Sequence, residues 1–387
     1  MTVPVPEAAG EGLAQRLAFL QRAGGAATAV FTALLAFFAG GIVVLATGHN
    51  PLSTYKAIFI GTGLTWPYRL LTGQDTADAA DNLQQTLLLT TPLILTGLAV
   101  AFAFRCGLFN IGGQGQYFAG AYVSVWIASS LSGTPGLLHI IFAIVAGSLA
   151  GALWGGIAGF LRATVGAHEV ITTIMLNWTA IFVGQYLFGQ GGPLQNSTNP
   201  SDPVSNDIAE NTKLHVWWGD PLIQGLHVGF FVALAMLVVF WLVLSRTTLG
   251  YEVRAVGFNP EAARYGGISV SRNYFLAMAI SGLFAGLAGT LDILGWQFRL
   301  GVIDIRSSQI GFVGIAVALL GRNTAIGVGL SALLFGALLT GTSTRNLNPD
   351  VFQPELAGNL TLMIQALVLL FVGADVLILW FWRRFRT

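Results

Sequence analysis

Long apolar stretches alternate with short polar segments along most of this chain. Runs of about 20 apolar residues are long enough to cross a bilayer as helices, and ten such runs can be read from the sequence. Their approximate limits are residues 26–46, 85–104, 108–130, 139–161, 170–189, 225–245, 274–295, 307–321, 323–342 and 359–382. The pattern predicts an all-α polytopic membrane protein with about ten transmembrane helices, in which residues 1–387 form a single domain.

Three polar segments separate or precede these runs. Residues 1–25 lack the short apolar core and cleavage site of a signal peptide, so the first run is expected to remain as an anchor. Residues 190–224 are rich in Gly, Pro, Asn, Ser and Asp, which favours an irregular loop. Residues 246–273 form the longest arginine-rich loop. A shorter apolar patch, residues 55–64, is expected to form a helix at the membrane interface.

The basic residues indicate how the chain is oriented. With a cytoplasmic N-terminus, twelve arginines lie at inner ends of the spans, and six lysines or arginines lie in the outer loops with most of the loop acids. Cytoplasmic loops are usually enriched in Lys and Arg. Both termini and the loop 246–273 are therefore expected in the cytoplasm, and the loop 190–224 outside the cell.

The inner loop contains the signals of a short capped helix between Gly257 and Ile268. Asn and Pro suit the N-cap and the first helical position, an early Glu complements the helix dipole, and a Gly pair ends the helix. Because about two helical turns are marginal alone in water, this helix needs a surface, either lipid headgroups or a partner protein. The candidate contact residues are Asn259, Pro260, Glu261, Ala262, Ala263, Arg264 and Gly267.

Composition excludes several other functions. The chain is 54% hydrophobic and 9% charged, which is far from the balance of a soluble domain. Its single cysteine, Cys106, cannot form an internal disulfide, and its histidines show no H-x-x-x-H spacing, so no metal or other cofactor is expected. The only lysines, Lys56 and Lys213, do not follow a glycine-rich phosphate loop. The chain is therefore not expected to hydrolyse ATP.

A segment early in the chain recurs near its C-terminal third. Residues 104–111 (FRCGLFNI) match residues 298–305 (FRLGVIDI), and the register continues to Phe118, Gly120 and Val123 opposite Phe312, Gly314 and Val317. In the expected topology the first copy enters the membrane from inside and the second from outside. This predicts an inverted repeat that relates spans 2–5 to spans 7–10, with span 6 between them.

Polar residues inside the spans are the candidates for a translocation path. Residues 110–116 contain three glycines, which favour irregular backbone that is tolerated at membrane depth only when buried or facing water. The alternative is a tight helix contact in which the amides bond neighbouring backbone. Because the central spans offer no Lys or Arg, the cargo is expected to be neutral. The candidate residues are Asn110, Gln114, Gln116, Asn177, Asp292 and Gln309.

Five segments together resemble a known family. They are LFNIGGQGQYFAGAY (108–122), GAHEVITTIMLNW (166–178), GFNPEAARYGGI (257–268), SGLFAGLAG (281–289) and GFVGIAVALLGR (311–322). In this order they resemble the permease subunits of ATP-binding-cassette (ABC) importers for ribose, nucleosides and branched-chain amino acids. The likeness is greatest to the nucleoside branch, whose receptors are lipoproteins of the basic-membrane-protein type. Gln114 departs from that branch, where Glu is expected.

The resemblance implies partners and a location. It implies a separate ABC ATPase subunit that uses ATP and docks on residues 259–267, a second and related permease subunit, and an extracellular solute-binding lipoprotein. Membrane lipid is a further partner, and no nucleic acid is expected. The location would be the cytoplasmic membrane of a bacterium, and the cargo most simply a nucleoside. Alternatives are an importer permease for ribose or another simple sugar, an ion-coupled secondary transporter, and a non-transporting scaffold or channel.

Overall fold

The chain is mainly helical, as the apolar pattern predicts. A computed structural model describes residues 30, 33–131, 133–220, 225–343, 346 and 354–373. Within these residues the only sheet is a two-stranded antiparallel one. The predicted cytoplasmic segment 1–25 and the last part of the expected span 359–382 lie outside the described residues.

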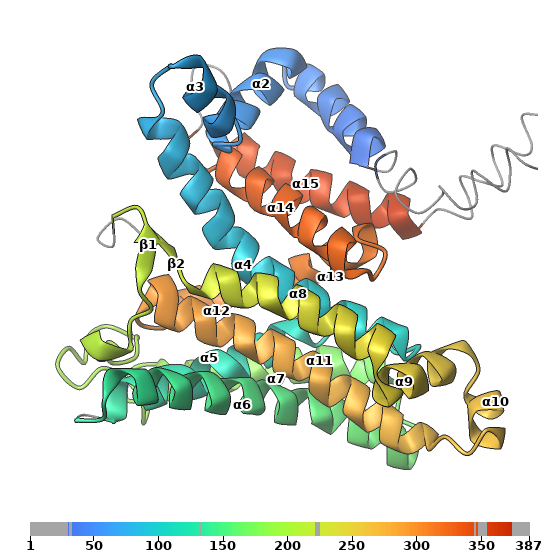
Figure 1. The fold of residues 1–387 in the computed structure, drawn as a ribbon. Helices are drawn as coiled ribbons and strands as arrows, with labels where there is room; N and C mark the ends of the chain where they lie inside the picture. Colours follow the sequence, from blue (N-terminus) through green and yellow to red (C-terminus); the bar gives the residue numbers. More distant parts are fainter. Residues whose placement is uncertain are drawn as a thin grey trace, which may run out of the picture.

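The helices and strands follow one another along the chain, and a long loop separates α7 from α8 (Figure 1). A helical segment, Ala33–Ala46, precedes the labelled elements. The first labelled group is α2 (Pro51–Gly61), α3 (Trp66–Thr72), α4 (Ala77–Arg105), α5 (Gly113–Ser130), α6 (Gly136–Val165) and α7 (Glu169–Phe188). The outer loop contains a short 3-10 turn (Glu210–Thr212), β1 (Val216–Trp218) and β2 (Leu226–His227).

The second half begins after this loop. Its elements are α8 (Gly229–Arg246), α9 (Thr248–Phe258), α10 (Pro260–Tyr265), α11 (Val270–Asp292), a π-helical turn (Ile293–Gln297), α12 (Val302–Ser307), α13 (Ile310–Leu320), α14 (Ala325–Gly341) and α15 (Pro354–Gly373). Each of the ten expected apolar stretches overlaps one of these helices or the segment Ala33–Ala46.

Fewer helices than ten have the length and hydropathy of a span by themselves. In the described part of the chain six helical segments qualify, or seven if Ala33–Ala46 and α2, which meet at 119°, form one span. The six are α4, α6, α7, α8, α11 with the π turn, and α12 with α13. The observed helices establish a polytopic membrane protein, and the total of ten spans stays a prediction. The expected interface helix at residues 55–64 begins earlier, at Pro51, because Asn50 caps it through the backbone N–H of Leu52.

α4 lies at the centre of the helix bundle. It packs against α8, α11, α13 and α14, and 83% of its most apolar stretch is buried, against 28% for α6 and 22% for α7 and α8. The outer helices therefore present wide apolar faces outwards, as lipid-facing helices do. α11 packs most closely on α6, where a Cβ atom at Gly282 would lie only 2.2 Å from the carbonyl oxygen of Gly151. Small residues allow this close backbone approach.

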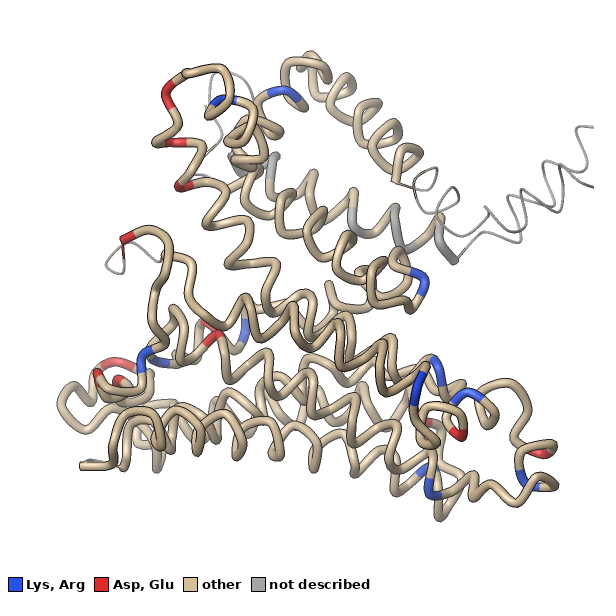
Figure 2. The backbone as a smooth tube through the Cα atoms, in the orientation of Figure 1, with Lys and Arg blue, Asp and Glu red and all other residues tan. Residues whose placement is uncertain are grey.

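Charged residues mark the two ends of the bundle. Arg105, Arg162 and Arg246 lie in the last turns of α4, α6 and α8, where positive side chains complement the helix dipole. These ends lie beside α9 and α10, whereas the outer loops carry most of the acids (Figure 2). The basic end of the molecule is thus the end that the charge pattern assigns to the cytoplasm.

Candidate functional site

The first copy of the repeated segment forms a break between α4 and α5. Asn110 is fully buried in this break. Its Nδ2 donates hydrogen bonds to Gln116 Oε1 at 2.8 Å and to Ser281 Oγ at 2.7 Å. Its Oδ1 accepts a bond from the backbone N–H of Gly112 at 2.8 Å. Side-chain amides therefore satisfy the buried polar groups that the interrupted helix leaves open.

Asn177 joins α7 to the same break. Its Oδ1 accepts a hydrogen bond from the N–H of Gly115 at 2.8 Å, and its Nδ2 donates to the carbonyl of Ile111 at 2.9 Å. Both backbone groups flank the start of α5. These contacts agree with the alternative to a translocation path, namely a tight helix contact in which a side-chain amide bonds the backbone of a neighbouring segment.

The second copy of the repeated segment also interrupts its helices. α11 continues into the π turn, Phe298 then adopts a left-handed conformation (φ 58°), and the short α12 precedes α13. Asp292 is fully buried beside this break. Its Oδ2 accepts a hydrogen bond from the Tyr117 hydroxyl at 2.7 Å and its Oδ1 accepts one from Trp296 Nε1 at 3.2 Å. The carboxyl group is thus tied to α5 about one turn after the start of that helix.

Gln114 connects the two breaks directly. Its Nε2 donates to the carbonyl of Ser308 at 2.9 Å, and its Oε1 accepts from the N–H of Gly311 at 2.7 Å. A Cβ atom at Gly311 would lie 2.3 Å from the Gln114 backbone nitrogen, so only glycine allows the two helix starts to meet so closely. Segments nearly 200 residues apart therefore share one fully buried amide.

The predicted path residues do not all lie in one place. Asn110, Gln114, Gln116 and Asn177 gather around the first break, whereas Asp292 lies beside the second break and bonds Tyr117 of α5. Gln309 is exposed, and its side chain makes no capping bond to α13. A path role for all six residues stays a prediction. Two partners, Ser281 and Tyr117, were missed, although both lie in the motifs quoted above.

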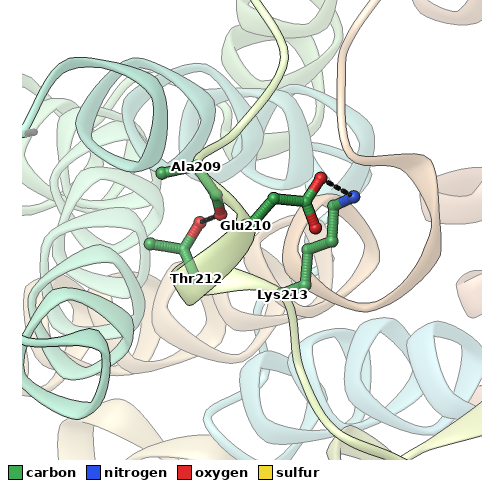
Figure 3. A network of polar contacts seen from close by, with 4 residues as sticks. All are labelled: Ala209, Glu210, Thr212 and Lys213. Atoms are coloured by element: carbon green, nitrogen blue, oxygen red, sulfur yellow. Dashed lines mark hydrogen bonds and ion pairs between the residues drawn. The ribbon is translucent and has the colours of Figure 1, made fainter.

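The outer loop covers the second break from the side opposite α10. Backbone N–H groups of Ser205, Ile208 and Leu214 donate to the carbonyls of Leu300, Phe298 and Leu294 at 2.8 to 2.9 Å. Figure 3 shows the turn between two of these contacts, in which Thr212 Oγ1 donates to Ala209 O and Lys213 Nζ pairs with Glu210, each at 2.6 Å. The predicted irregular loop 190–224 is therefore hydrogen-bonded to the second break through residues between Ser205 and Leu214.

His227 supports the same break from β2 without adding charge. Its side chain is buried, and a Cβ atom at Gly295 of the π turn would lie 2.3 Å from its Nε2. Nδ1 accepts a hydrogen bond from the N–H of Gly229 at 3.1 Å. Burial lowers the pKa of His227 to about 4, so the ring is neutral at physiological pH. The interior near the breaks therefore gains no cation from this histidine.

α10 forms at the basic end where the sequence predicts a capped helix. Asn259 Oδ1 accepts hydrogen bonds from the N–H groups of Glu261 and Ala262 at 3.0 and 3.1 Å. Pro260 occupies the first turn, and Gly267, rather than Gly266, takes the left-handed conformation (φ 79°) that ends the helix. The predicted limits and cap of this helix are confirmed.

The side chains of α10 divide into an inward and an outward set. Ala263 is buried and faces the rest of the chain, whereas Arg264 and Glu261 form an exposed ion pair at 3.6 Å. Phe258, directly before the N-cap of α10, and Tyr265, the last residue of α10, are 92% and 94% exposed. These two aromatic residues are not among the contact residues that the sequence predicts. Large aromatic side chains this exposed at a helix end are typical of a contact with another protein.

Helices broken inside a bundle of apolar spans, with their polar groups paired at the breaks, are typical of membrane transporters. Comparison with known proteins specifies the kind. Residues 82–373 match the family described as branched-chain amino acid transport system / permease component. The chain belongs to this family.

Three relatives resemble the chain along most of its length. The guanosine ABC transporter permease protein NupP of Bacillus subtilis is 35% identical over 350 residues, covering 88% of this chain and 91% of NupP. The nucleoside ABC transporter permease protein NupB of Lactococcus lactis is 36% identical over 348 residues, covering 88% and 89%. The glucose ABC transporter permease protein TsgB13 of Haloferax volcanii is 35% identical over 366 residues, covering 93% and 89%. No solved structure matches.

Proposed function

We propose that this chain is the permease subunit of an ABC importer that carries nucleosides across the cytoplasmic membrane of a bacterium. The observation that carries the proposal is the identity of 35% and 36%, over 88% of the chain, to permeases named for guanosine and nucleosides. The polar groups at the two breaks agree with such a cargo. Amides and hydroxyls both donate and accept hydrogen bonds, as nucleoside bases and ribose do.

Glucose is the second candidate cargo. The permease named for glucose is as similar as the one named for guanosine, at 35% identity. A simple sugar is also neutral and rich in hydroxyl groups, so the same paired amides would suit it. Sequence identity to these relatives therefore supports an importer of neutral solutes, and the uptake experiment below separates nucleosides from glucose.

The proposal includes a mechanism and partners. A separate ATPase subunit binds α10, uses ATP and moves this helix, and a second, related permease completes the path. An extracellular lipoprotein delivers the cargo. The two repeats, spans 2–5 and 7–10 of ten, rock about the contact at Gln114 so that the path opens to each side in turn. The recurrence of residues 104–111 as 298–305 and the contact of Gln114 with the second break support the inverted repeat, and the arginines at one end support cytoplasmic termini.

The test of the cargo is uptake by cells that lack only this gene. We expect deletion to reduce uptake of radiolabelled guanosine at least tenfold, and a plasmid copy to restore it. Unlabelled nucleosides should compete for the restored uptake, and glucose in hundredfold excess should not. Full retention of guanosine uptake in the deletion strain, together with loss of its glucose uptake, would select the sugar instead.

A further inference from the structure

A cavity of about 180 Å³ lies at the basic end of the bundle, and its lining includes none of the candidate path residues. It is formed where α4 ends, α8 passes into α9, and α14 begins. The residues that shape it include Arg105, Arg254, Trp241, Ser245, Asn323 and Thr324. Trp241 and Ser245 are exposed, so the cavity opens to the surface of the bundle.

Two arginines face this cavity without a carboxylate. Arg105 donates through Nε and Nη2 to the carbonyl of Asn323 at 3.0 and 2.7 Å, and Arg254 donates through Nε to the carbonyl of Gly250 at 3.2 Å. Among the described residues neither arginine forms an ion pair. Glu252, the acid nearest in sequence to Arg254, accepts its hydrogen bond from Asn273 instead. Two positive charges therefore meet in one half-buried place with guanidinium donors to spare.

The surroundings of the cavity select an anion that has an apolar part. Thr324, the N-cap of α14, and the first turn of this helix lie at the cavity. The helix N-terminus adds a partial positive charge there. From the cavity an apolar strip runs along α8, where Val238, Trp241 and Leu242 are 55%, 48% and 43% exposed. Arg246 lies over the Trp241 ring at 5.8 Å, as expected for an aromatic residue at headgroup level.

We propose that this cavity binds the phosphate of an anionic phospholipid in the leaflet at the basic end. The phosphate accepts hydrogen bonds from Arg105 and Arg254, since guanidinium groups and phosphate oxygens match in geometry. The acyl chains lie along the exposed strip of α8. Basic pockets between helices at this depth bind anionic headgroups, and a free phosphate or nucleotide would leave the apolar strip unused. The site goes beyond transport of the cargo and adds a lipid requirement.

The test measures binding of fluorescent phosphatidylglycerol to the full chain, purified with its partner subunits and stripped of lipid. We expect saturable binding, with phosphatidylcholine at least tenfold weaker. Arg254→Gln should weaken phosphatidylglycerol binding about fivefold, because one arginine near the membrane surface contributes about 1 kcal/mol, and Arg254→Lys should retain most of it. Ser245→Glu, an exposed substitution that does not threaten folding, should weaken binding at least as much by placing a carboxylate at the cavity. Arg272→Gln is the control, since Arg272 is exposed at the same end but outside the cavity.

Three results would overturn the proposal. Equal affinity for phosphatidylcholine would show that no anion is recognised. The cavity would be assigned to a free phosphate if inorganic phosphate or AMP bound in a way that depends on Arg254, while phosphatidylglycerol bound no better than phosphatidylcholine. Loss of the ATPase subunit from the Arg254→Gln complex, with phosphatidylglycerol binding unchanged, would assign it to a protein contact.

Discussion

Replacing Phe258 and Tyr265 together with alanine is expected to abolish ATP-driven uptake while the permease still folds and inserts. Both side chains are more than 90% exposed, so their removal leaves no cavity in this chain. If they anchor the ATPase subunit, each loss should cost about 2–4 kcal/mol of binding, as aromatic hot spots do. Each single change should then weaken the ATPase contact about 30-fold or more. The measurement is the amount of ATPase subunit that co-purifies, together with uptake.

A matched control separates this effect from a general loss of aromatic surface. Tyr186 on α7 is also widely exposed, at 72%, but lies on an apolar outward face far along the chain from α10. Tyr186→Ala should leave both the ATPase contact and uptake unchanged. Arg264→Glu, which breaks the exposed pair with Glu261, should weaken the contact less than the aromatic pair does, because exposed ion pairs contribute little. Full uptake with both aromatic residues absent would exclude α10 as the coupling contact.

Gln114→Leu is expected to destabilise the membrane domain and to stop transport. The substitution leaves the N–H of Gly311 and the carbonyl of Ser308 without their present partner in a buried place. Each buried group that loses its hydrogen bond costs about 1–3 kcal/mol. The apparent melting temperature of the purified protein in detergent should fall by several degrees, and uptake should fall to background. A melting temperature and uptake equal to those of the unchanged protein would contradict the bridging role of Gln114.

Gln114→Glu distinguishes loss of the two hydrogen bonds of Gln114 from a change in the size and packing of its side chain. A neutral glutamic acid can accept from Gly311 and donate to Ser308 as the amide does, and the related branch is expected to carry Glu at this position. We therefore expect Gln114→Glu to retain most stability at mildly acidic pH and to lose it as the carboxyl group ionises. Equal damage by Leu and Glu at every pH would show that size or packing, and not the paired hydrogen bonds, decides the effect.

The sequence predicts the helices and α10 because their signals are local. Apolar runs decide which segments enter the bilayer, and the cap of α10 requires only Asn259 and the residues directly after it. Local signals do not show which side of α10 faces outwards. The sequence therefore predicts both Ala263, which is buried, and Arg264, which is exposed, as contact residues. It does not indicate Phe258 or Tyr265.

The contacts between the two breaks could not be predicted in the same way. Gln114 meets Gly311 because the starts of α5 and α13 lie against each other in the folded bundle, which no local sequence signal shows. Gln309 and Gln114 are both glutamines, yet only Gln309 is exposed. The side chain of Gln114 lies inside the bundle, whereas Gln309 lies on its surface at the start of α13. Residue type alone therefore does not predict which glutamine is buried.

ATP dependence of uptake by the purified complex tests the central claim most directly. The permease, with the subunits that co-purify, is placed in liposomes with ATP trapped inside and the solute-binding protein and radiolabelled guanosine outside. We predict accumulation of guanosine with ATP and none with a non-hydrolysable analogue, in the absence of any ion gradient. Accumulation without nucleotide that collapses when a protonophore is added would contradict the account and identify an ion-coupled transporter.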